Sequence, residues 1–301
     1  MDNQFSRPAI FTALGLSIAM VLGVVLGAKY VLTHADRAPV TITALPSDGA
    51  GSPRCSALIN SLPDKFMGHP RAEVAQPQPP GTAAWATFSD TPVTLRCGVD
   101  LPYQYNVFSQ TQTIGGNSWL EVKDMTPGSD LVTWYNTDHV PTVAVTTHDN
   151  GEPKLDLSAL DPADEKISPR PAPLADLAAG NTDSCEQFMN ALPAEITPDY
   201  HSAQPGVATV KHSRAWVAKG REAIVLRCGV APPPGYQAGK RLVQVNDIPW
   251  FEDTTLAGGT TASTWFALGR ATDIAVYVPQ DVAGEVLVVL GDLITETTPV
   301  Q

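Results

Sequence analysis

Hydrophobic positions along the chain form one long run, followed by two similar series of short runs. Residues 8–28 carry no charged side chain and are rich in Leu, Val, Ile, Ala and Gly. An α-helix rises 1.5 Å per residue, so this run spans the ~30 Å hydrocarbon core of a bilayer. A secretory signal peptide usually has an apolar core of only about 7–15 residues. We therefore predict that residues 1–35 are a cytoplasmic stub and a retained transmembrane helix, with cleavage after Ala35 as the alternative.

The pattern after this segment indicates short helices and strands. From Cys55 and from Cys185, apolar residues follow at helical spacing until Pro63 and Pro193, which predicts two short helices. Runs typical of β-strands lie at 93–99, 142–147, 224–230, 241–245 and 273–278, and at Trp134 and Trp265. The last apolar run, 284–294, fits either a helix packed on the sheet or a strand. A helix, several strands and a closing element predict an α+β fold with a mostly antiparallel sheet and flanking helices.

The two series are copies of each other. The segment Cys-Ser-Ala-Leu-Ile-Asn-Ser-Leu-Pro at 55–63 returns as Cys-Glu-Gln-Phe-Met-Asn-Ala-Leu-Pro at 185–193, and Leu-Arg-Cys-Gly-Val at 95–99 returns unchanged at 226–230. Three tryptophans, Trp85, Trp119 and Trp134, recur 131 positions later as Trp216, Trp250 and Trp265. A nearly constant offset indicates tandem duplication. The predicted parts are a tether at 36–54, a first repeat at 55–160, a Pro-rich linker at 161–184, a second repeat at 185–295 and a tail at 296–301.

Cysteine usage indicates the compartment. There are four cysteines, two at equivalent positions in each copy. Even, duplicated pairing is typical of a disulfide framework, which needs an oxidising compartment. Of the three connectivities, only Cys55–Cys97 with Cys185–Cys228 lets each copy fold by itself, so we predict these two bridges. A zinc site or a redox pair is the alternative, although no Cys-x-x-Cys occurs.

Charge bears on orientation and on partners. The few Lys and Arg residues around 8–28 do not set the orientation of the helix, so the cysteines decide it and residues 36–301 are expected outside the cell membrane. The formal net charge is −12, and all of the acidic excess lies after residue 35. An acidic surface repels phosphate backbones, so we predict no nucleic-acid partner.

Motifs for catalysis or metal binding are absent from the sequence. It contains no Gly-x-Ser-x-Gly, Ser-x-x-Lys, Gly-x-Gly-x-x-Gly, P-loop or His-Glu-x-x-His. The six histidines are scattered without metal-ligand spacing and are interpreted as surface or linker residues. We therefore predict no catalytic residue, no metal site and no cofactor.

One group in the second copy has the composition of an anion site: Arg227, Trp250, Trp265 and Arg270. Two guanidinium groups beside two indoles would bind a carboxylate or phosphate with cation–π support. Arg270 is the sharper candidate because the first copy has His139 at that position. In the alternative interpretation, Arg96 and Arg227, which occur in both copies, cap backbone carbonyls or stack on core tryptophans.

Several of these motifs together resemble a known family. The pattern Cys-x-x-Leu/Phe-x-x-x-Leu-Pro, an Ala-Trp pair, Leu-Arg-Cys-Gly-Val followed by prolines, a later Trp-Phe and Thr-Trp-Phe-Ala-Leu-Gly-Arg is similar to the actinobacterial DUF3515 family. The resemblance covers 185–294 well and the first copy more loosely. It departs at His139, and at Asn117-Ser118 and Ile248-Pro249, where an Asp is expected. It implies an envelope protein with an N-terminal membrane segment and no assigned activity.

These observations favour a single-pass membrane protein of the cell envelope that acts as a non-catalytic binding or scaffolding module for an envelope protein. The competing hypothesis is an extracytoplasmic enzyme or a receptor for an anionic cell-wall component, acting through the second repeat. A concave pocket at the Arg/Trp group of that repeat alone would favour the second hypothesis. A thiol–disulfide oxidoreductase ranks third, because no reactive cysteine motif is present.

Overall fold

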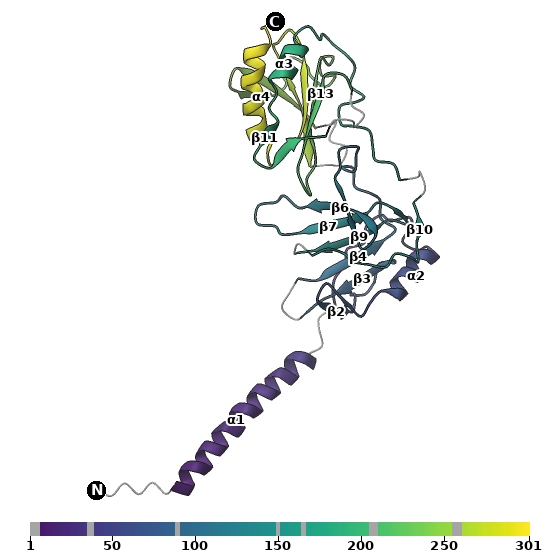
Figure 1. Ribbon diagram of the computed structural model, residues 1–301, viewed down its shortest axis with the longest axis vertical. Coiled ribbons are helices and arrows are strands. Elements are labelled where there is room, and N and C mark those ends of the chain that lie inside the picture. The colour runs from purple at the N-terminus through teal and green to yellow at the C-terminus, as the bar shows by residue number, and fades with distance from the viewer. Residues whose placement is uncertain are drawn as a thin grey trace, which may run out of the picture.

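A computed structural model describes residues 7–34, 39–87, 91–148, 151–163, 167–204, 210–254 and 261–301. Residues 1–6 of the predicted stub, 35–38 at the predicted helix–tether junction and 164–166 of the predicted linker lie outside the described residues. The described chain forms a long N-terminal helix and two sheet domains stacked along one axis (Figure 1). The helices are α1 (Arg7–His34), α2 (Pro53–Ser61), α3 (Cys185–Ala191) and α4 (Ala283–Thr297).

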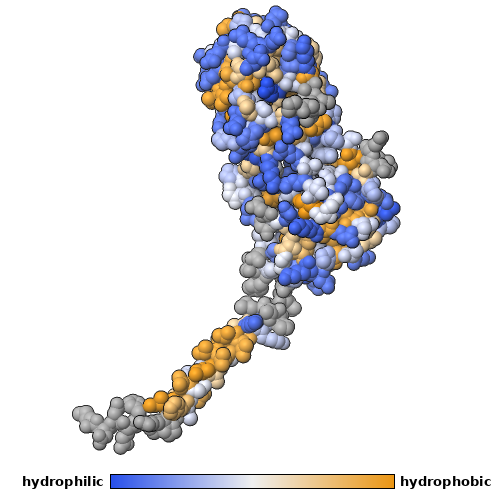
Figure 2. Space-filling model, viewed as in Figure 1, coloured by the Kyte–Doolittle hydropathy of each residue, from blue (hydrophilic) through white to orange (hydrophobic). Residues whose placement is uncertain are grey.

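Helix α1 is long and apolar enough to cross a membrane along Ile10–Val31, and none of this stretch is buried against the rest of the protein. Figure 2 shows it as an almost continuous hydrophobic rod that projects away from the two domains. A signal sequence close to the N-terminus meets the same criteria. The structure therefore agrees with a membrane span or a signal sequence at this end of the chain.

Each domain contains an eight-stranded antiparallel sheet, and the strand order is the same in both. The orders are β1-β2-β3-β4-β9-β7-β6-β5 and β11-β12-β13-β14-β18-β17-β16-β15. The first sheet comprises β1 (Lys65–Phe66), β2 (His69–Ala72), β3 (Thr82–Trp85), β4 (Val93–Cys97), β5 (Thr111–Ile114), β6 (Asn117–Lys123), β7 (Val132–Asn136) and β9 (Val143–Thr147). The second comprises β11 (Glu195–Thr197), β12 (Tyr200–Ser202), β13 (Ser213–Val217), β14 (Ile224–Cys228), β15 (Val243–Val245), β16 (Ile248–Asp253), β17 (Ala262–Ala267) and β18 (Ile274–Pro279). A separate ladder joins β8 (His139–Val140) to β10 (Asp161–Pro162). The tandem α+β architecture predicted from the sequence is confirmed.

One face of each sheet carries the main core. Side chains alternate along a strand, so Ile224, Leu226 and Cys228 of β14 all point to the face covered by α3 and α4. In the first domain α2 covers the equivalent face together with an extended segment that contributes Leu155, Leu157 and Leu160. The two domains therefore share a sheet but differ in what covers it.

Among the residues that the structure describes, the closing helix occurs only in the second domain. The run at 284–294, which fitted either a helix or a strand, lies within α4. The equivalent stretch of the first copy contains Pro153 and Pro162, and proline removes a helix hydrogen bond and clashes with the preceding turn. Residues 151–163 accordingly contain no helix.

Both predicted disulfides are present. Cys55 is bonded to Cys97 and Cys185 to Cys228, with a Cα–Cα distance of 5.6 Å in each bridge. Each bridge ties the start of a helix to the end of a central strand, over separations of 42 and 43 residues. In the chain-entropy treatment, closing a loop of this size stabilises a domain by about 4 kcal/mol.

The shared Leu-Arg-Cys-Gly-Val motif holds the segment that precedes each domain. Arg96 donates from Nη2 to the carbonyl oxygen of Thr43 at 3.0 Å, and Arg227 donates from Nη1 to that of Leu174 at 2.9 Å. Thr43 and Leu174 are themselves 131 positions apart. The arginine therefore makes the same contact in both copies.

The glycine of the Leu-Arg-Cys-Gly-Val motif allows the segment that precedes each domain to cross the sheet in direct contact with its backbone. Gly98 has φ +84°, and a Cβ atom there would lie 2.2 Å from the backbone nitrogen of Ala50. Gly229 has φ +76°, and its Cβ would lie 2.5 Å from Cγ2 of Thr182. A positive φ favours glycine at both positions, and the close approach excludes any side chain at Gly98.

Much of the predicted tether packs on the first domain. Val40 and Ile42 are buried in a small cluster with Val74, Ala84 and Ala86. The backbone N–H of Val40 donates to the carbonyl oxygen of Glu73 at 2.8 Å. Among the described residues that follow α1, Val40 is the first that is buried, and it lies only a few positions after the end of the helix.

A loop of the first domain joins it to the second. Phe108 is 5% exposed and packs, together with Val107, against residues of the second sheet: Ala215, Val217, Ala223, Val225, Ala262 and Tyr277. Along β14, Val225 alternates with the residues that face α3 and α4, so this loop occupies the opposite face. The position equivalent to Phe108 in the second copy is Gly239, so only the first copy has such an anchor.

Polar contacts beside Phe108 also connect the two domains. The backbone N–H of Lys123 donates to the carbonyl oxygen of Gly220 at 2.9 Å. Nζ of Lys219 lies 3.6 Å from Oε2 of Glu121, whose side chain is only 5% exposed. The first domain thus holds the second through both apolar and polar contacts.

Candidate functional site

The arginine that the sequence places at a candidate anion site in β14 is used internally. Arg227 is 8% exposed, and its Nη1 donates to three carbonyl oxygens of the linker, those of Leu174, Ala175 and Leu177, at 2.9, 3.2 and 2.6 Å. These are the carbonyl contacts of the alternative interpretation. The guanidinium group fixes the linker on the sheet.

Arg270 lies at the C-terminal end of α4. It is 7% exposed; its Nη1 donates to the carbonyl oxygen of Thr298 at 3.2 Å, and its Nη2 to Oγ1 of Thr295 at 3.3 Å. A cation at this end of a helix is favourable because the last carbonyls carry partial negative charge. The first copy has no closing helix, and accordingly it has no arginine at the equivalent position.

The two tryptophans of the candidate group are core residues. Trp250 is 0% and Trp265 9% exposed, and both belong to the cluster between the second sheet and its helices. Arg227 lies on the opposite sheet face, because it alternates with Cys228. The structure therefore does not bring Arg227, Trp250, Trp265 and Arg270 together on one exposed face.

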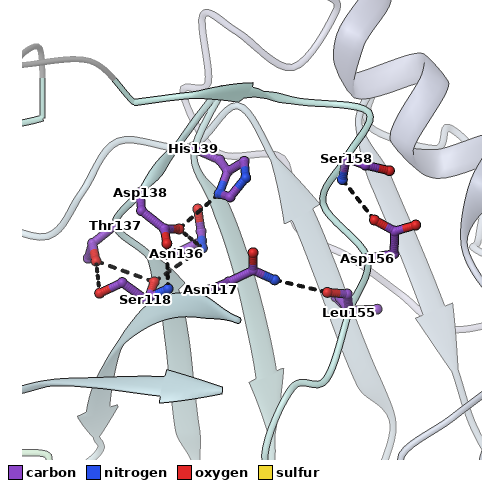
Figure 3. A network of polar contacts seen from close by, with 9 residues as sticks. All are labelled: Asn117, Ser118, Asn136, Thr137, Asp138, His139, Leu155, Asp156 and Ser158. Carbon is purple, nitrogen blue, oxygen red and sulfur yellow. Dashed lines mark hydrogen bonds and ion pairs between the residues drawn. The ribbon is translucent and has the colours of Figure 1, made fainter. Parts of the chain in front are cut away.

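A polar network occupies one of the places where the two copies differ (Figure 3). In the first domain the network joins the start of β6 to the end of β7 through Asn117, Ser118, Asn136, Thr137, Asp138 and His139. The second copy has Ile, Pro, Ala, Leu, Gly and Arg at the equivalent positions. A polar cluster thus replaces a mostly apolar one.

Asp138 is the centre of this network. Its Oδ2 accepts the backbone N–H of Ser118 at 2.6 Å, and its Oδ1 accepts Nδ2 of Asn136 at 2.7 Å. Nδ1 of His139 lies 2.8 Å from the same Oδ1. An ionised carboxylate only accepts, so it favours the tautomer with the proton on Nδ1 and leaves Nε2 as an acceptor. The imidazole is oriented as in a general base or a metal ligand.

Hydroxyl groups extend the network on one side. Thr137 donates from Oγ1 to Oγ of Ser118 at 2.9 Å. The Tyr105 hydroxyl also hydrogen-bonds Thr137, and burial raises the pKa of Tyr105. The arrangement offers one oriented imidazole and several neutral hydroxyls, which suits hydrogen bonding to a polar group.

The same network has a clear structural use. Asn117 donates from Nδ2 to the carbonyl oxygen of Leu155 at 3.0 Å, and the N–H of Ala163 donates to the carbonyl oxygen of Asp138 at 2.7 Å. These contacts fix the extended segment that replaces the closing helix. Sequence reasoning did not identify the network as a site. The divergence between the copies at His139 and at Asn117-Ser118 was the signal that could have indicated it. His139 was instead interpreted as a surface residue, whereas its side chain is only 17% exposed in the structure.

A buried carboxyl group lies beside the joint in the second domain. Glu222 is 6% exposed; its Oε2 accepts the hydroxyl of Tyr277 at 2.8 Å, and its Oε1 accepts the N–H and the hydroxyl of Thr261, both at 3.3 Å. Burial raises the pKa of Glu222, and the hydrogen bonds from Tyr277 and Thr261 oppose the shift. Tyr277 also packs in the cluster that holds Phe108.

Replacing Glu222 with glutamine is expected to flatten the dependence of stability on pH. A folded-state pKa above the unfolded value means that the folded protein binds more protons, so stability falls as pH rises from about 4.5 through the raised pKa. Each pKa unit is worth about 1.4 kcal/mol. The melting temperature of Glu222→Gln relative to that of the wild type should rise as the pH increases above about 4.5. Glu285→Gln, at an exposed site on α4, is the control, and equal pH profiles for the wild type and Glu222→Gln would contradict the assignment.

A cleft of ≈ 900 Å³ lies between the two domains. Its first wall is formed by Val107–Gln112, and its second by Asp199, His201–Gln204 and Val217–Lys219. The walls mix apolar groups with charged and amide side chains. None of the four residues of the candidate anion group lines this cleft. Among the described residues, no group of three or more His, Cys, Asp or Glu side chains is placed to hold a metal ion.

Comparison with known proteins agrees with the duplicated fold. The model of a family described as "Protein of unknown function (DUF3515)" matches residues 14–168 and again residues 157–301. No curated protein and no solved structure matches the chain. The two matches together cover almost the whole chain, and each contains one disulfide-bridged sheet domain. The chain therefore belongs to the DUF3515 family and contains its domain twice.

Proposed function

We propose that this protein is a single-pass membrane protein of the cell envelope whose two extracytoplasmic domains form one non-catalytic binding module for an envelope protein. The observation that carries the proposal is the cleft between the domains, because both copies contribute a wall to it. Its volume falls in the range of about 300–1,000 Å³ that is usual for ligand pockets. A duplicated domain gains such a site only when the two copies are held in a fixed relation.

Two features of the chain support this compartment. Stable disulfides persist in oxidising compartments, and each domain carries one. Helix α1 has the length and hydropathy of a span, and no part of it between Ile10 and Val31 packs on the domains. These features support an anchor in the cell membrane with both domains outside.

The side chains of the cleft favour binding rather than catalysis. Val107 and Val217, which are half-buried, offer apolar contact, while Asp199 and Lys219 offer opposite charges. This mixture is typical of protein interfaces, which combine an apolar centre with a polar rim. A receptor for an anionic component that uses the second repeat would require Arg227 and Arg270 to leave their present oxygen acceptors.

Site-specific crosslinking in cells tests this function. A photoreactive residue in place of His201, which is exposed in the cleft, should trap an envelope protein when the full-length chain is in its own membrane. The same residue in place of Glu285, exposed on α4, is the matched control. Mass spectrometry identifies the trapped protein. Equal adducts at both positions, or none at His201, would contradict a binding site in the cleft.

A further inference from the structure

The edge of the first sheet forms part of the cleft wall. We propose that the partner enters the cleft as an extended peptide segment and pairs, as an added antiparallel or parallel strand, with the outer edge of β5. This inference rests on the proposed binding function and names its chemistry: a polypeptide backbone rather than a sugar, lipid or nucleotide. Only an extended chain offers N–H and C=O groups in the alternation that a strand edge requires.

Strand β5 is the last strand of its sheet, after β6. Within the described residues, no strand pairs with its outer side. The hairpin register identifies which backbone groups point outward. Gly115 and Gly116, with φ +62° and +89°, form a two-residue turn of the primed kind, which places Ile114 and Asn117 in the hydrogen-bonded closing pair.

Hydrogen-bonded and non-hydrogen-bonded pairs alternate along an antiparallel ladder. Counting from this closing pair, the backbone N–H and C=O groups of Thr111 and Thr113 point away from β6. An independent contact supports the register: Ser118, opposite Thr113, directs its N–H to Asp138 and not to β5. Thr111 itself lines the cleft. Its N–H and C=O groups therefore face the space in which a further strand would lie, about 4.8 Å away.

Apart from its short length of four residues, β5 lacks the features that protect sheet edges. Native edges are usually blocked by very short strands, lysine, proline, a bulge or an inward-pointing charge. The strand reads Thr-Gln-Thr-Ile, and its pairing with β6 is regular. In the second copy the corresponding strand, β15, directly follows Lys240, Arg241 and Leu242. The edge of β5, which has no such basic residues, therefore faces the cleft, whereas the basic residues lie beside β15 at the edge of the second sheet.

The opposite wall fits a peptide that runs along β5. It presents Asp199, His201 and Lys219, which can select the side chains of a bound segment. Gln112 donates from Nε2 to Oε2 of Glu121 at 2.9 Å, so its side chain is held against the sheet. Affinity would come from main-chain pairing with β5, and specificity from the second domain.

Proline substitution tests the backbone pairing directly. Random twelve-residue peptides displayed on phage are selected against the full-length protein in lipid nanodiscs, and the enriched peptides are synthesised for calorimetry. Thr111→Pro removes the outward N–H at the first residue of β5, where proline is tolerated. We expect it to weaken peptide binding about tenfold or more. Thr111→Val, which keeps the N–H, and Leu242→Pro, the same change at the equivalent position of the second copy, should stay within about twofold of the wild type.

The outcomes separate this inference from the function on which it rests. Failure to enrich any peptide, or equal binding by wild type and Thr111→Pro with an unchanged melting temperature, overturns strand pairing. If crosslinking from His201 still traps a protein in that case, the cleft binds a partner by side-chain contacts and the proposed function stands. If crosslinking also fails, the binding function itself is wrong. If Thr111→Pro lowers the melting temperature, a second test uses the selected peptide instead of the protein. Its backbone nitrogens are methylated at the odd positions in one version and at the even positions in another. Strand pairing requires that one of these two versions loses binding.

Discussion

Replacing Gly98 with alanine is expected to destabilise the first domain by about 4 kcal/mol or more, a loss that is exceptional for a single methyl group. Two effects add. The backbone φ of +84° disfavours a side chain, and the new Cβ would lie 2.2 Å from the nitrogen and 2.7 Å from the Cα of Ala50. Backbone atoms cannot move aside as a flexible side chain does, so the segment before α2 must lift from the sheet. Urea unfolding of the full-length protein, followed by tryptophan fluorescence, measures the loss.

Gly128 supplies a matched control for this substitution. It has the same φ of +84°, but nothing lies within 4 Å of its hypothetical Cβ. Gly128→Ala therefore carries only the conformational cost, roughly 1–2 kcal/mol. If Gly98→Ala and Gly128→Ala lose equal stability, the close crossing over Gly98 does not exist in solution.

Replacing Phe108 with alanine is expected to release the second domain from the first. Truncation of a buried phenylalanine typically costs 3–5 kcal/mol, and here the cluster that contains Phe108 consists, apart from Val107, of residues of the linker and the second domain. The contacts that remain between the domains include the backbone hydrogen bond from Lys123 to Gly220 and the pair of Lys219 with Glu121. A half-exposed ion pair contributes little, so these contacts should not hold the domains in one arrangement. Distances between spin labels on the two domains should broaden, and the radius of gyration in small-angle scattering should rise.

A phenylalanine inside one domain provides the comparison. Phe66 is 6% exposed and packs on Trp85 with ring centroids 4.9 Å apart. Phe66→Ala should lower stability by a similar amount while leaving the interdomain distances sharp. In contrast, Phe108→Ala should also abolish crosslinking from His201, because the cleft needs both walls. Unchanged distance distributions in Phe108→Ala would show that the joint does not depend on this side chain.

The two-domain architecture could be predicted from the sequence because each motif occurs twice, so that the two copies support the same interpretation. The pairs Cys55–Cys97 and Cys185–Cys228 could be predicted because only this pairing is closed within a copy. Strands near Val93 and Ile224 were visible as β-type runs in both copies. The closing helix was ambiguous because its buried positions, such as Val286, Leu287 and Leu290, also form a continuous apolar run.

Contacts between the copies were not visible in the sequence. Phe108 stands in a polar loop, and the cluster that buries it consists, apart from Val107, of residues of the linker and the second domain that lie more than sixty positions away. The use of Arg227 was also hidden, because its three carbonyl acceptors belong to a Pro-rich segment that composition predicts to be a semi-extended linker. The periodicity of apolar residues predicts which face a strand buries in its own domain. It does not predict contacts with a neighbouring domain or with the backbone of a linker that packs on the sheet.

The packing of Val40 close to the end of α1 has a consequence for the proposed binding function. Five residues separate the end of α1 from Val40, and six Cα–Cα steps of about 3.5 Å each reach at most ~21 Å. With α1 in the bilayer, the first domain is confined to a thin layer above the lipid surface. A partner anchored in the same membrane would meet the cleft at a high effective concentration, whereas a freely diffusing one would gain nothing from the anchor. Lengthening this connector with a flexible insert would dilute the first kind of partner and leave the second unaffected.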